Sequence, residues 1–164
     1  MIETHIRKAV GDDANAIADI YNHHIEIGGS TFDTKPWAAT DVGKLIEKPP
    51  PDAWFVADSD HRILGWSATR PHSQRHGYRY TCETAIYLHP NFTGRGIGDQ
   101  LQTQIEEHCR QIGLHHAVAK IISDNHRSIS FHQRHGYEIV GVQKEIGRMR
   151  NRWCDVTIMQ RIFD

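Results

Sequence analysis

The chain has 164 residues, a formal net charge of −1 at pH 7 and an isoelectric point near 6.9. This balance gives no basic surface for nucleic acid, and no apolar run approaches the roughly 20 residues that a membrane-spanning helix needs. The N-terminal stretch MIETHIRKAV lacks the pattern of a signal peptide. With 38% hydrophobic residues, the chain is long enough for one domain with a core, which we expect to span residues 1–164.

The three cysteines, Cys82, Cys109 and Cys154, are odd in number and widely separated. Such a set does not indicate a disulfide framework, so we expect a reducing, cytoplasmic environment. The sequence also contains 13 histidines, but it has no HExxH motif and no Cys/His spacing typical of a metal site. We therefore expect no metal.

The first part of the chain predicts a strand followed by two helices. Residues 2–7 alternate in the manner of a strand, and Asp12 or Asp13 is then placed to cap a helix with apolar residues at helical spacing. A shorter helix is expected after a cap at Thr40. The residues predicted to face inward are Ala14, Ile17, Ala18, Tyr21 and Ile25 in the first helix and Val42, Leu45 and Ile46 in the second.

The middle of the chain is rich in β-forming residues. Residues 53–70, AWFVADSDHRILGWSATR, hold two apolar runs on either side of DSDH, which predicts a hairpin. Residues 78–90, YRYTCETAIYLHP, are rich in threonine, tyrosine and isoleucine and end at a proline. This composition predicts another strand.

The last part predicts a long helix, a buried strand, a short helix and two final strands. The complete order, β-α-α-β-β-β-α-β-α-β-β, indicates an α/β sandwich with a mixed sheet. The expected elements are a helix from Ile97 to a stop at Gly113, a strand at 116–122, a helix from a cap at Asp124 or Asn125 to a stop at Gly136, and strands at 137–146 and 153–163.

Three alternating glycines lie between the strand that ends at Leu88 and the long helix. Gly94, Gly96 and Gly98 are unusual there, because a glycine inside a helix costs roughly 1 kcal/mol relative to alanine. Glycines at a strand–loop–helix junction allow main-chain N–H groups to close on a phosphate. In the alternative interpretation, the first two are ordinary turn residues and the third is a packing contact. The patterns GxxxxGK[ST] and GxGxxG do not fit, which disfavours a nucleotide or dinucleotide site.

The segment TGRGIG at 93–98 resembles the acetyl-CoA signature R/Q-x-x-G-x-G/A of the GNAT superfamily of N-acetyltransferases. The resemblance is greatest to the phosphinothricin and methionine sulfoximine acetyltransferases and runs from about residue 2 to residue 163. Thr93 departs from the signature, which has glutamine or arginine there, so we expect a weakened hold on the cofactor. The other segments that carry the resemblance are IYNHHIEIGGSTFDTKP, YRYTCETAIYLHP, SDNHRSISFHQRHGY and RWCDVTIMQ.

The resemblance implies an α/β fold with a mixed, mostly antiparallel central sheet and helices on both faces, and acetyl-CoA as co-substrate. It implies that the strand before the glycines carries free main-chain groups for the pantetheine arm, and that the glycine segment wraps the diphosphate. Asn125 also has a simpler role as a helix cap, and the two roles can coexist. The implied cofactor-binding residues are Ile86, Tyr87, Leu88, Gly94, Arg95, Gly96, Ile97, Gly98, Asp99, Asn125 and Ser128.

Glu83 is the expected catalytic base. Acetyl transfer to an amine needs the amine in its neutral form, and a carboxylate can accept the proton directly or through water. Glu83 also falls on the catalytic glutamate of the resembled family. His132 is implied as the general acid or as a cofactor contact. Cys82 points to the opposite strand face from Glu83 and is expected in the core.

The resemblance places the acceptor pocket near Phe32, Arg75 and Tyr78, partly with a second subunit, and so implies a homodimer. The expected reaction moves an acetyl group from acetyl-CoA to the α-amino group of a small amino acid of the phosphinothricin, methionine sulfoximine or sulfone type. Two alternatives remain open: an acetyltransferase acting on protein N-termini or lysines, and a non-catalytic acetyl-CoA sensor.

Overall fold

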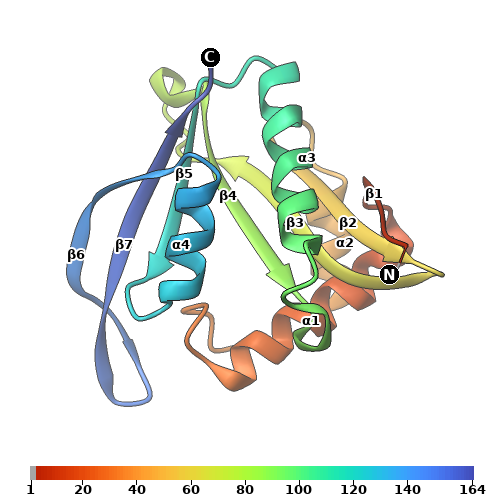
Figure 1. The fold of residues 1–164 in the computed structure, drawn as a ribbon, viewed down its shortest axis with the longest axis horizontal. Helices are drawn as coiled ribbons and strands as arrows, with labels where there is room; N and C mark the ends of the chain where they lie inside the picture. Colours follow the sequence, from red (N-terminus) through yellow and green to blue (C-terminus); the bar gives the residue numbers. More distant parts are fainter. Residues whose placement is uncertain (1–2) are drawn as a thin grey trace.

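The computed structural model describes residues 3–164, so Ile2 of the first predicted strand lies outside the described residues. Within that range, seven strands form one sheet and four α-helices pack on it (Figure 1). Short 3-10 turns precede α1, β4 and α3. The bounds of the strands and α-helices are β1 His5–Lys8, α1 Ala14–Ile27, α2 Ala39–Ile46, β2 Ala53–Ser59, β3 Arg62–Pro71, β4 Thr81–Leu88, α3 Ile97–Gln111, β5 His116–Ile122, α4 His126–Arg134, β6 Glu138–Met149 and β7 Arg152–Ile162.

The strand order in the sheet is β1-β2-β3-β4-β5-β7-β6. Neighbouring strands run antiparallel except for β4 and β5, which are parallel. The β4–β5 ladder starts at Thr81 and His116 and ends at Glu83 and Val118. Beyond that pair the two strands diverge (Figure 1). The sheet therefore opens along the C-terminal half of β4.

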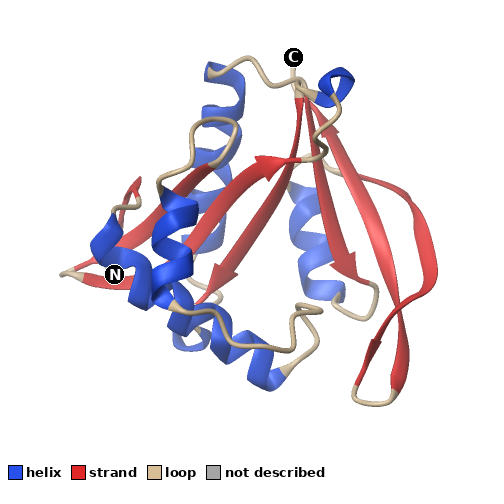
Figure 2. Cartoon of the chain, turned by 180° about the vertical axis from the view of Figure 1, so that it is seen from behind, coloured by secondary structure: helices blue, strands red, loops and turns tan. Residues whose placement is uncertain are grey.

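Helices cover both faces of the sheet, as the sequence predicts. Helices α3 and α4 lie on one face and α1 and α2 on the other, which we call the α3/α4 face and the α1/α2 face (Figures 1 and 2). Seen from behind, α1 and α2 lie over the first strands of the sheet, whereas the described chain places no helix over β5, β7 and β6 on that face (Figure 2). The expected mixed, mostly antiparallel architecture is confirmed.

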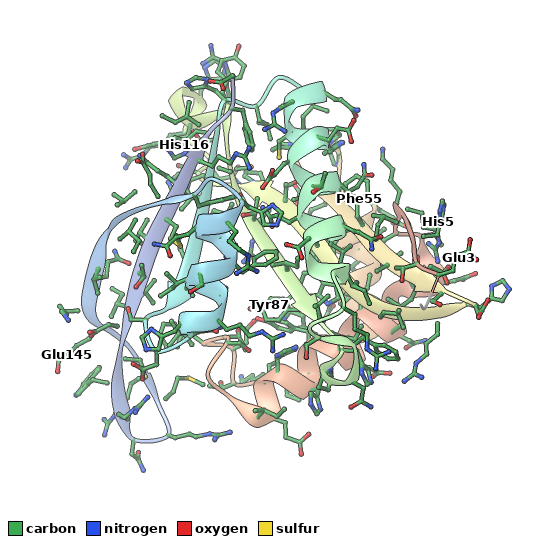
Figure 3. The ribbon with its side chains drawn as sticks, viewed as in Figure 1. Glu3, His5, Phe55, Tyr87, His116 and Glu145 are labelled. Atoms are coloured by element: carbon green, nitrogen blue, oxygen red, sulfur yellow. The ribbon has the colours of Figure 1, made fainter. Side chains whose placement is uncertain are left out.

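Apolar side chains fill both interfaces between helices and sheet. On the α1/α2 face an aromatic cluster joins the loop after α1 to the strands: the Tyr21 and Trp37 rings are 3.8 Å apart, and Trp37 stacks on Trp66 at 5.9 Å. On the other face Phe55 of β2 points toward α3, where its ring is 5.4 Å from that of His108 (Figure 3). These two layers hold the strands at the positions from which the site is built.

Two expected helix caps are wrong. Asp13 makes no side-chain cap to α1; its carboxylate instead accepts hydrogen bonds from the Val10 N–H at 2.8 Å and from the Arg7 guanidinium. The second helix begins at Ala39, one residue before the predicted cap at Thr40, and Ala38 at its N-cap offers no side-chain acceptor. Neither helix therefore begins at a side-chain cap.

The later helix ends follow the sequence. Asn125 caps α4, because its Oδ1 accepts a hydrogen bond from the Ser128 N–H at 3.2 Å. Gly113 and Gly136 follow α3 and α4 with φ of +77° and +78°, a conformation that glycine adopts without steric cost. The predicted strand at 78–90 is shorter than expected, since 3-10 turns occupy 76–78 and 90–92.

Gly65 of β3 packs closely against β4, the strand that borders the opening. A Cβ at Gly65 would lie 2.4 Å from Leu88 Cδ2 and 3.0 Å from the Tyr87 carbonyl oxygen. We predict that Gly65→Ala lowers the free energy of unfolding by about 1–3 kcal/mol, as overpacking does in other cores. Gly43→Ala is the control, because Gly43 lies inside α2 with nothing within 4 Å of an added Cβ and should gain about 1 kcal/mol. Urea denaturation of both variants measures their free energies of unfolding. Equal values for Gly65→Ala and Gly43→Ala would show that Gly65 is not tightly packed.

Candidate active site

A cavity of about 720 Å³ lies where β4 and β5 separate. Its walls come from the end of α1 and the following loop, from β4, from the start of α3, and from β5 and α4. It brings together many of the residues that the sequence singled out. These are Glu83, Ile86, Tyr87, Leu88, Gly94, Gly96, Gly98, Asp99, Asn125, Ser128 and His132.

The open edge of β4 exposes main-chain groups to this cavity. The His89 N–H donates to the Leu64 carbonyl at 2.8 Å, and the Thr81 carbonyl accepts from the His72 N–H at 3.4 Å. Odd-numbered residues of β4 therefore bond to β3, and the alternation of an antiparallel ladder turns even-numbered residues toward β5. Past the end of the β4–β5 ladder these groups face the opening.

Ile86 and Leu88 are the residues whose main-chain groups meet the opening. The Leu88 carbonyl already accepts a hydrogen bond from His24 Nε2 at 2.8 Å. Tyr87 requires a correction, because its main chain pairs with Trp66 of β3 and is not available to a ligand.

Tyr87 instead contributes its side chain to the α1/α2 face (Figure 3). Its hydroxyl donates to the Ser30 carbonyl at 3.0 Å, and its ring stands edge-on to that of Tyr21 at 4.9 Å. Burial raises the pKa of Tyr87 to about 12. The phenol therefore stays neutral at physiological pH and fixes the loop that follows α1 against the sheet.

The glycines at the start of α3 have different structural reasons. Gly94 and Gly96 have φ of +74° and +76°, and Gly96 is the left-handed N-cap of the helix. A Cβ at either would meet nothing within 4 Å. At Gly98, by contrast, a Cβ would lie 3.3 Å from the Phe131 ring and 3.6 Å from Leu88. The structure therefore supports the alternative interpretation of the motif: two glycines turn the chain beside the cavity, and the third allows close packing. Binding of a phosphate by the main chain stays a prediction.

The start of α3 is suited to an anion. The first N–H groups of a helix have no partner within it, and the helix dipole is positive at this end. The glycine turn borders the cavity, and no atom lies within 4 Å of a Cβ added at Gly94 or Gly96, so no side chain covers these groups there. The hydroxyl of Thr93 donates locally to the Pro90 carbonyl at 3.3 Å, so it supports the turn.

The remaining residues of this segment differ in placement. The Ile97 side chain is buried in the core with Leu101, and the Arg95 guanidinium lies 5.4 Å from the Phe92 ring; neither residue lines the cavity. Asp99 does line it, and its carboxylate accepts from His135 Nε2 at 2.9 Å. Any ligand contact at Ile97 therefore has to be through its main chain.

Glu83 lies at the closed end of the opening, on the α1/α2 face of β4. Its Oε1 accepts hydrogen bonds from Lys120 Nζ at 2.7 Å and from His72 Nδ1 at 3.1 Å, and 19% of its side chain is exposed. Arg70 is its partner across the β3–β4 ladder. Cys82 points the other way and is fully buried against Cys109, as predicted.

His132 does not support the role of general acid. Its side chain is buried, with the residue 4% exposed, and Nδ1 lies 2.7 Å from the Ser128 carbonyl oxygen. A carbonyl oxygen only accepts, so Nδ1 carries the proton. Burial lowers the pKa of His132 below its usual value, so the ring is neutral at pH 7. Nε2 can then accept a hydrogen bond from a ligand in the cavity but has no proton to donate.

The three predicted acceptor residues lie outside the cavity. Phe32 packs against β6, where a Cβ at Gly147 would meet its ring at 2.6 Å. Arg75 is exposed in the loop before β4, and Tyr78 contacts the site only through His72, with 5.4 Å between the rings. Arg75 and Tyr78 lie in the loop between β3 and β4, which leads into the paired start of β4 and not into its open C-terminal half.

Arg70 and Lys120 are two charged cavity residues beside Glu83 that the sequence reasoning missed. Arg70 is the penultimate residue of β3 and Lys120 lies within β5, and the strand order puts both beside Glu83. A lysine inside the apolar run HAVAKII is the one local signal that indicated an unusual position.

Residues 3–164 contain no group of three or more His, Cys, Asp or Glu side chains arranged to hold a metal ion. In the same range, none of the helices is both long enough and apolar enough to cross a bilayer.

We predict that His132→Asn keeps turnover within about 10-fold of wild type at pH 7, because asparagine retains the donor to the Ser128 carbonyl. Loss of a true general acid would cost about 10²–10⁴-fold. Steady-state kinetics as a function of pH measure this. A larger loss of turnover, together with a shift of the alkaline limb of the pH–rate profile, would show that His132 is the general acid.

The same variant should also change the acid stability of the fold. Because folding lowers the pKa of His132, its contribution is present above about 6.5, the unfolded value, and is lost as the pH falls. Melting temperatures of the wild type should therefore drop more steeply between pH 7 and 5 than those of His132→Asn.

Comparison with known proteins agrees with this geometry. The model of the acetyltransferase (GNAT) family matches residues 17–137. The phosphinothricin N-acetyltransferase of Streptomyces coelicolor is 30% identical, over 97% of this chain and 96% of that protein. The L-methionine sulfoximine/L-methionine sulfone acetyltransferase of Pseudomonas aeruginosa is 33% identical, over 97% and 94%. A putative acetyltransferase from Salmonella typhimurium, solved with its cofactor acetyl-CoA, superposes with a TM-score of 0.95 at 27% identity, over 99% of this chain and 95% of that one.

The family model covers most of the chain, and the relatives match it over nearly its full length. In the structure, the sheet opens beside α3, a helix with a glycine at its N-cap. The chain belongs to the acetyltransferase (GNAT) family and is an acetyltransferase.

Proposed function

We propose that the chain transfers an acetyl group from acetyl-CoA to the α-amino group of a small amino-acid-like substrate of the phosphinothricin, methionine sulfoximine or methionine sulfone type. One observation carries this proposal. A carboxylate, Glu83, and a guanidinium, Arg70, stand side by side on paired strands in the cavity that also holds the open edge of β4 and the start of α3.

The cofactor's place follows from the two ends of the opening. The diphosphate binds the N–H groups at the start of α3, between Gly94 and Gly98, where glycine leaves room for its oxygens. The pantetheine arm runs along the free edge of β4 past Leu88 and Ile86 toward Glu83. At a rise of about 3.3 Å per residue this path is about 17 Å long, which an extended pantetheine arm can span.

Helix α4 forms the other side of this path. Asn125, Ser128 and His132 all line the cavity, and in its neutral form His132 offers Nε2 as an acceptor for an amide N–H of the arm. The cofactor supplies the activated acetyl thioester. The chain holds the arm straight between two strands and brings its end to the base.

The acceptor is a zwitterion in this proposal. Its ammonium group lies at Glu83 and its carboxylate at Arg70, so that the two charges of an α-amino acid meet opposite charges on adjacent strands. Glu83 accepts a proton from the ammonium, directly or through water, and the neutral amine attacks the thioester. Arg70 replaces the predicted Arg75 in this role, because Arg75 lies outside the cavity.

A cytoplasmic homodimer remains part of the proposal. β6 is an edge strand with exposed apolar side chains, and such edges favour pairing with another chain. The exposed apolar residues of β6 and β7 are Ile139, Val140, Val142, Ile146, Trp153 and Ile162.

The decisive experiment measures CoA release from acetyl-CoA with a panel of acceptors. The panel holds phosphinothricin, methionine sulfoximine, methionine sulfone, the standard amino acids, and peptides with free N-termini or lysines. Turnover with the small sulfur- or phosphorus-containing amino acids supports the proposal. Turnover with peptides alone would assign a protein acceptor, and acetyl-CoA binding without any turnover would indicate a sensor.

Glu83→Gln separates catalysis from binding in the same assay. The substitution keeps the shape of the side chain and removes its basicity, so acetyl-CoA should bind near wild-type strength while turnover at pH 7 falls by about 10²-fold or more. Turnover should recover in part at high pH, where the acceptor amine is already neutral. Near-wild-type turnover of Glu83→Gln at pH 7 would place the base elsewhere.

Gly96→Val tests the diphosphate site, and Gly113→Val is its matched control. Both glycines have φ near +76° and no atom within 4 Å of an added Cβ. Both valine variants are therefore destabilised by the same backbone strain, about 1–2 kcal/mol. Only Gly96 borders the cavity, and there the side chain would block an approaching phosphate. Calorimetry should show acetyl-CoA affinity reduced about 10-fold or more in Gly96→Val alone, whereas equal affinities would remove the diphosphate from this turn.

A further inference from the structure

Lys120 lies in the position that the proposed acceptor amine occupies. We propose that Lys120 is itself an acetyl acceptor: with acetyl-CoA bound and no amino acid present, the chain transfers one acetyl group to Lys120 Nζ. This inference rests on the proposed function. It assigns a modification site to a side chain that the transfer reaction does not otherwise use.

The place of Lys120 in the sheet supports this. The β4–β5 ladder ends at Glu83 and Val118, and Lys120 is the next residue of β5 on the same face. It lines the cavity at the point where the two strands part. An arm that enters from the start of α3 and runs between the strands has its end at this closed point, so the thioester and the lysine amine meet there.

The contacts of Lys120 are those that a reacting amine needs. Its Nζ lies 2.7 Å from Glu83 Oε1, within reach of the proposed base. Its side chain is 49% exposed, which leaves it free to turn toward the opening. The other groups around Glu83 are His72, bonded to the same oxygen at 3.1 Å, and Arg70 on the neighbouring strand. Arg70 is not a nucleophile, so Lys120 is the amine placed to react.

The transfer balances with the components already present. The Lys120 ammonium gives one proton to Glu83 and becomes a neutral amine. Its nitrogen forms a bond to the thioester carbonyl carbon, the carbon–sulfur bond breaks, and CoA leaves as a thiolate. The second amine proton is lost as the amide forms, the thiolate is protonated, and one net proton passes to solvent. The amide carries no charge, so Glu83 loses its Lys120 ion pair and keeps His72.

Lys144 provides an internal control. It also forms an ion pair, with Asp155 Oδ2 at 2.9 Å, but its side chain is 77% exposed and lies outside the cavity. Slow chemical acetylation by acetyl-CoA reaches both lysines. Only Lys120 gains from a bound thioester held beside it, and such proximity raises rates by large factors.

The experiment incubates the full chain with acetyl-CoA carrying an isotope-labelled acetyl group, without acceptor, and follows each lysine by peptide mass spectrometry. We expect Lys120 to be labelled at least about 10-fold faster than Lys144, up to one acetyl group per chain. Lys120→Arg keeps a cation beside Glu83 and should lower incorporation to the level of surface lysines. Glu83→Gln should slow labelling at Lys120 and leave Lys144 unchanged.

The acceptor panel, run on the same preparation, separates the two proposals. Turnover with amino acids and labelling of Lys120 no faster than Lys144 would overturn this inference alone. The same is true if Glu83→Gln labels Lys120 at the wild-type rate. Selective labelling of Lys120 without turnover of any amino acid would uphold the inference and overturn the proposed acceptor class. Absence of both would overturn both.

Discussion

The end of the β4–β5 ladder is the constraint on which the rest of the site depends. Main-chain groups inside a sheet are normally paired, and a strand interior without a neighbour is costly unless something else satisfies it. Here the pairing stops at Glu83 and Val118, and β4 continues to Leu88 with one edge free. The cavity, its open main-chain groups and the arrangement of both flanking helices follow from that single interruption.

Packing on the α3/α4 face holds the strands apart. Tyr137, which follows α4, is buried between the diverging elements, and its hydroxyl contacts Thr84 of β4 and Gln102 of α3, each at 3.3 Å. Burial raises the pKa of Tyr137, so this contact stays neutral. Behind it, Glu106 pairs with Arg161 of β7 at 2.5 Å. The opening is thus supported by hydrogen bonds and ion pairs on its buried side.

Charged side chains are grouped on the α1/α2 face of the opening. Alternation along β4 sends Cys82 into the core and Glu83 toward the cavity, where two strands bring a lysine and an arginine beside it. Buried His132, with its proton fixed on Nδ1, adds an acceptor to the α4 side and no charge. Under the proposed function, the neutral arm of the cofactor and the zwitterionic acceptor would meet different electrostatic surroundings within one cavity.

The sequence by itself determined the order of elements, the faces of β4, the glycine start of α3 and the Asn125 cap, because each depends on a period of two or 3.6 residues or on a neighbour within one turn. Only the tertiary structure decided where β4 and β5 part, and that Lys120 meets Glu83 while Arg75 lies outside the cavity. These features depend on strand order, register and burial. They join residues far apart in the chain, and no local pattern encodes such contacts.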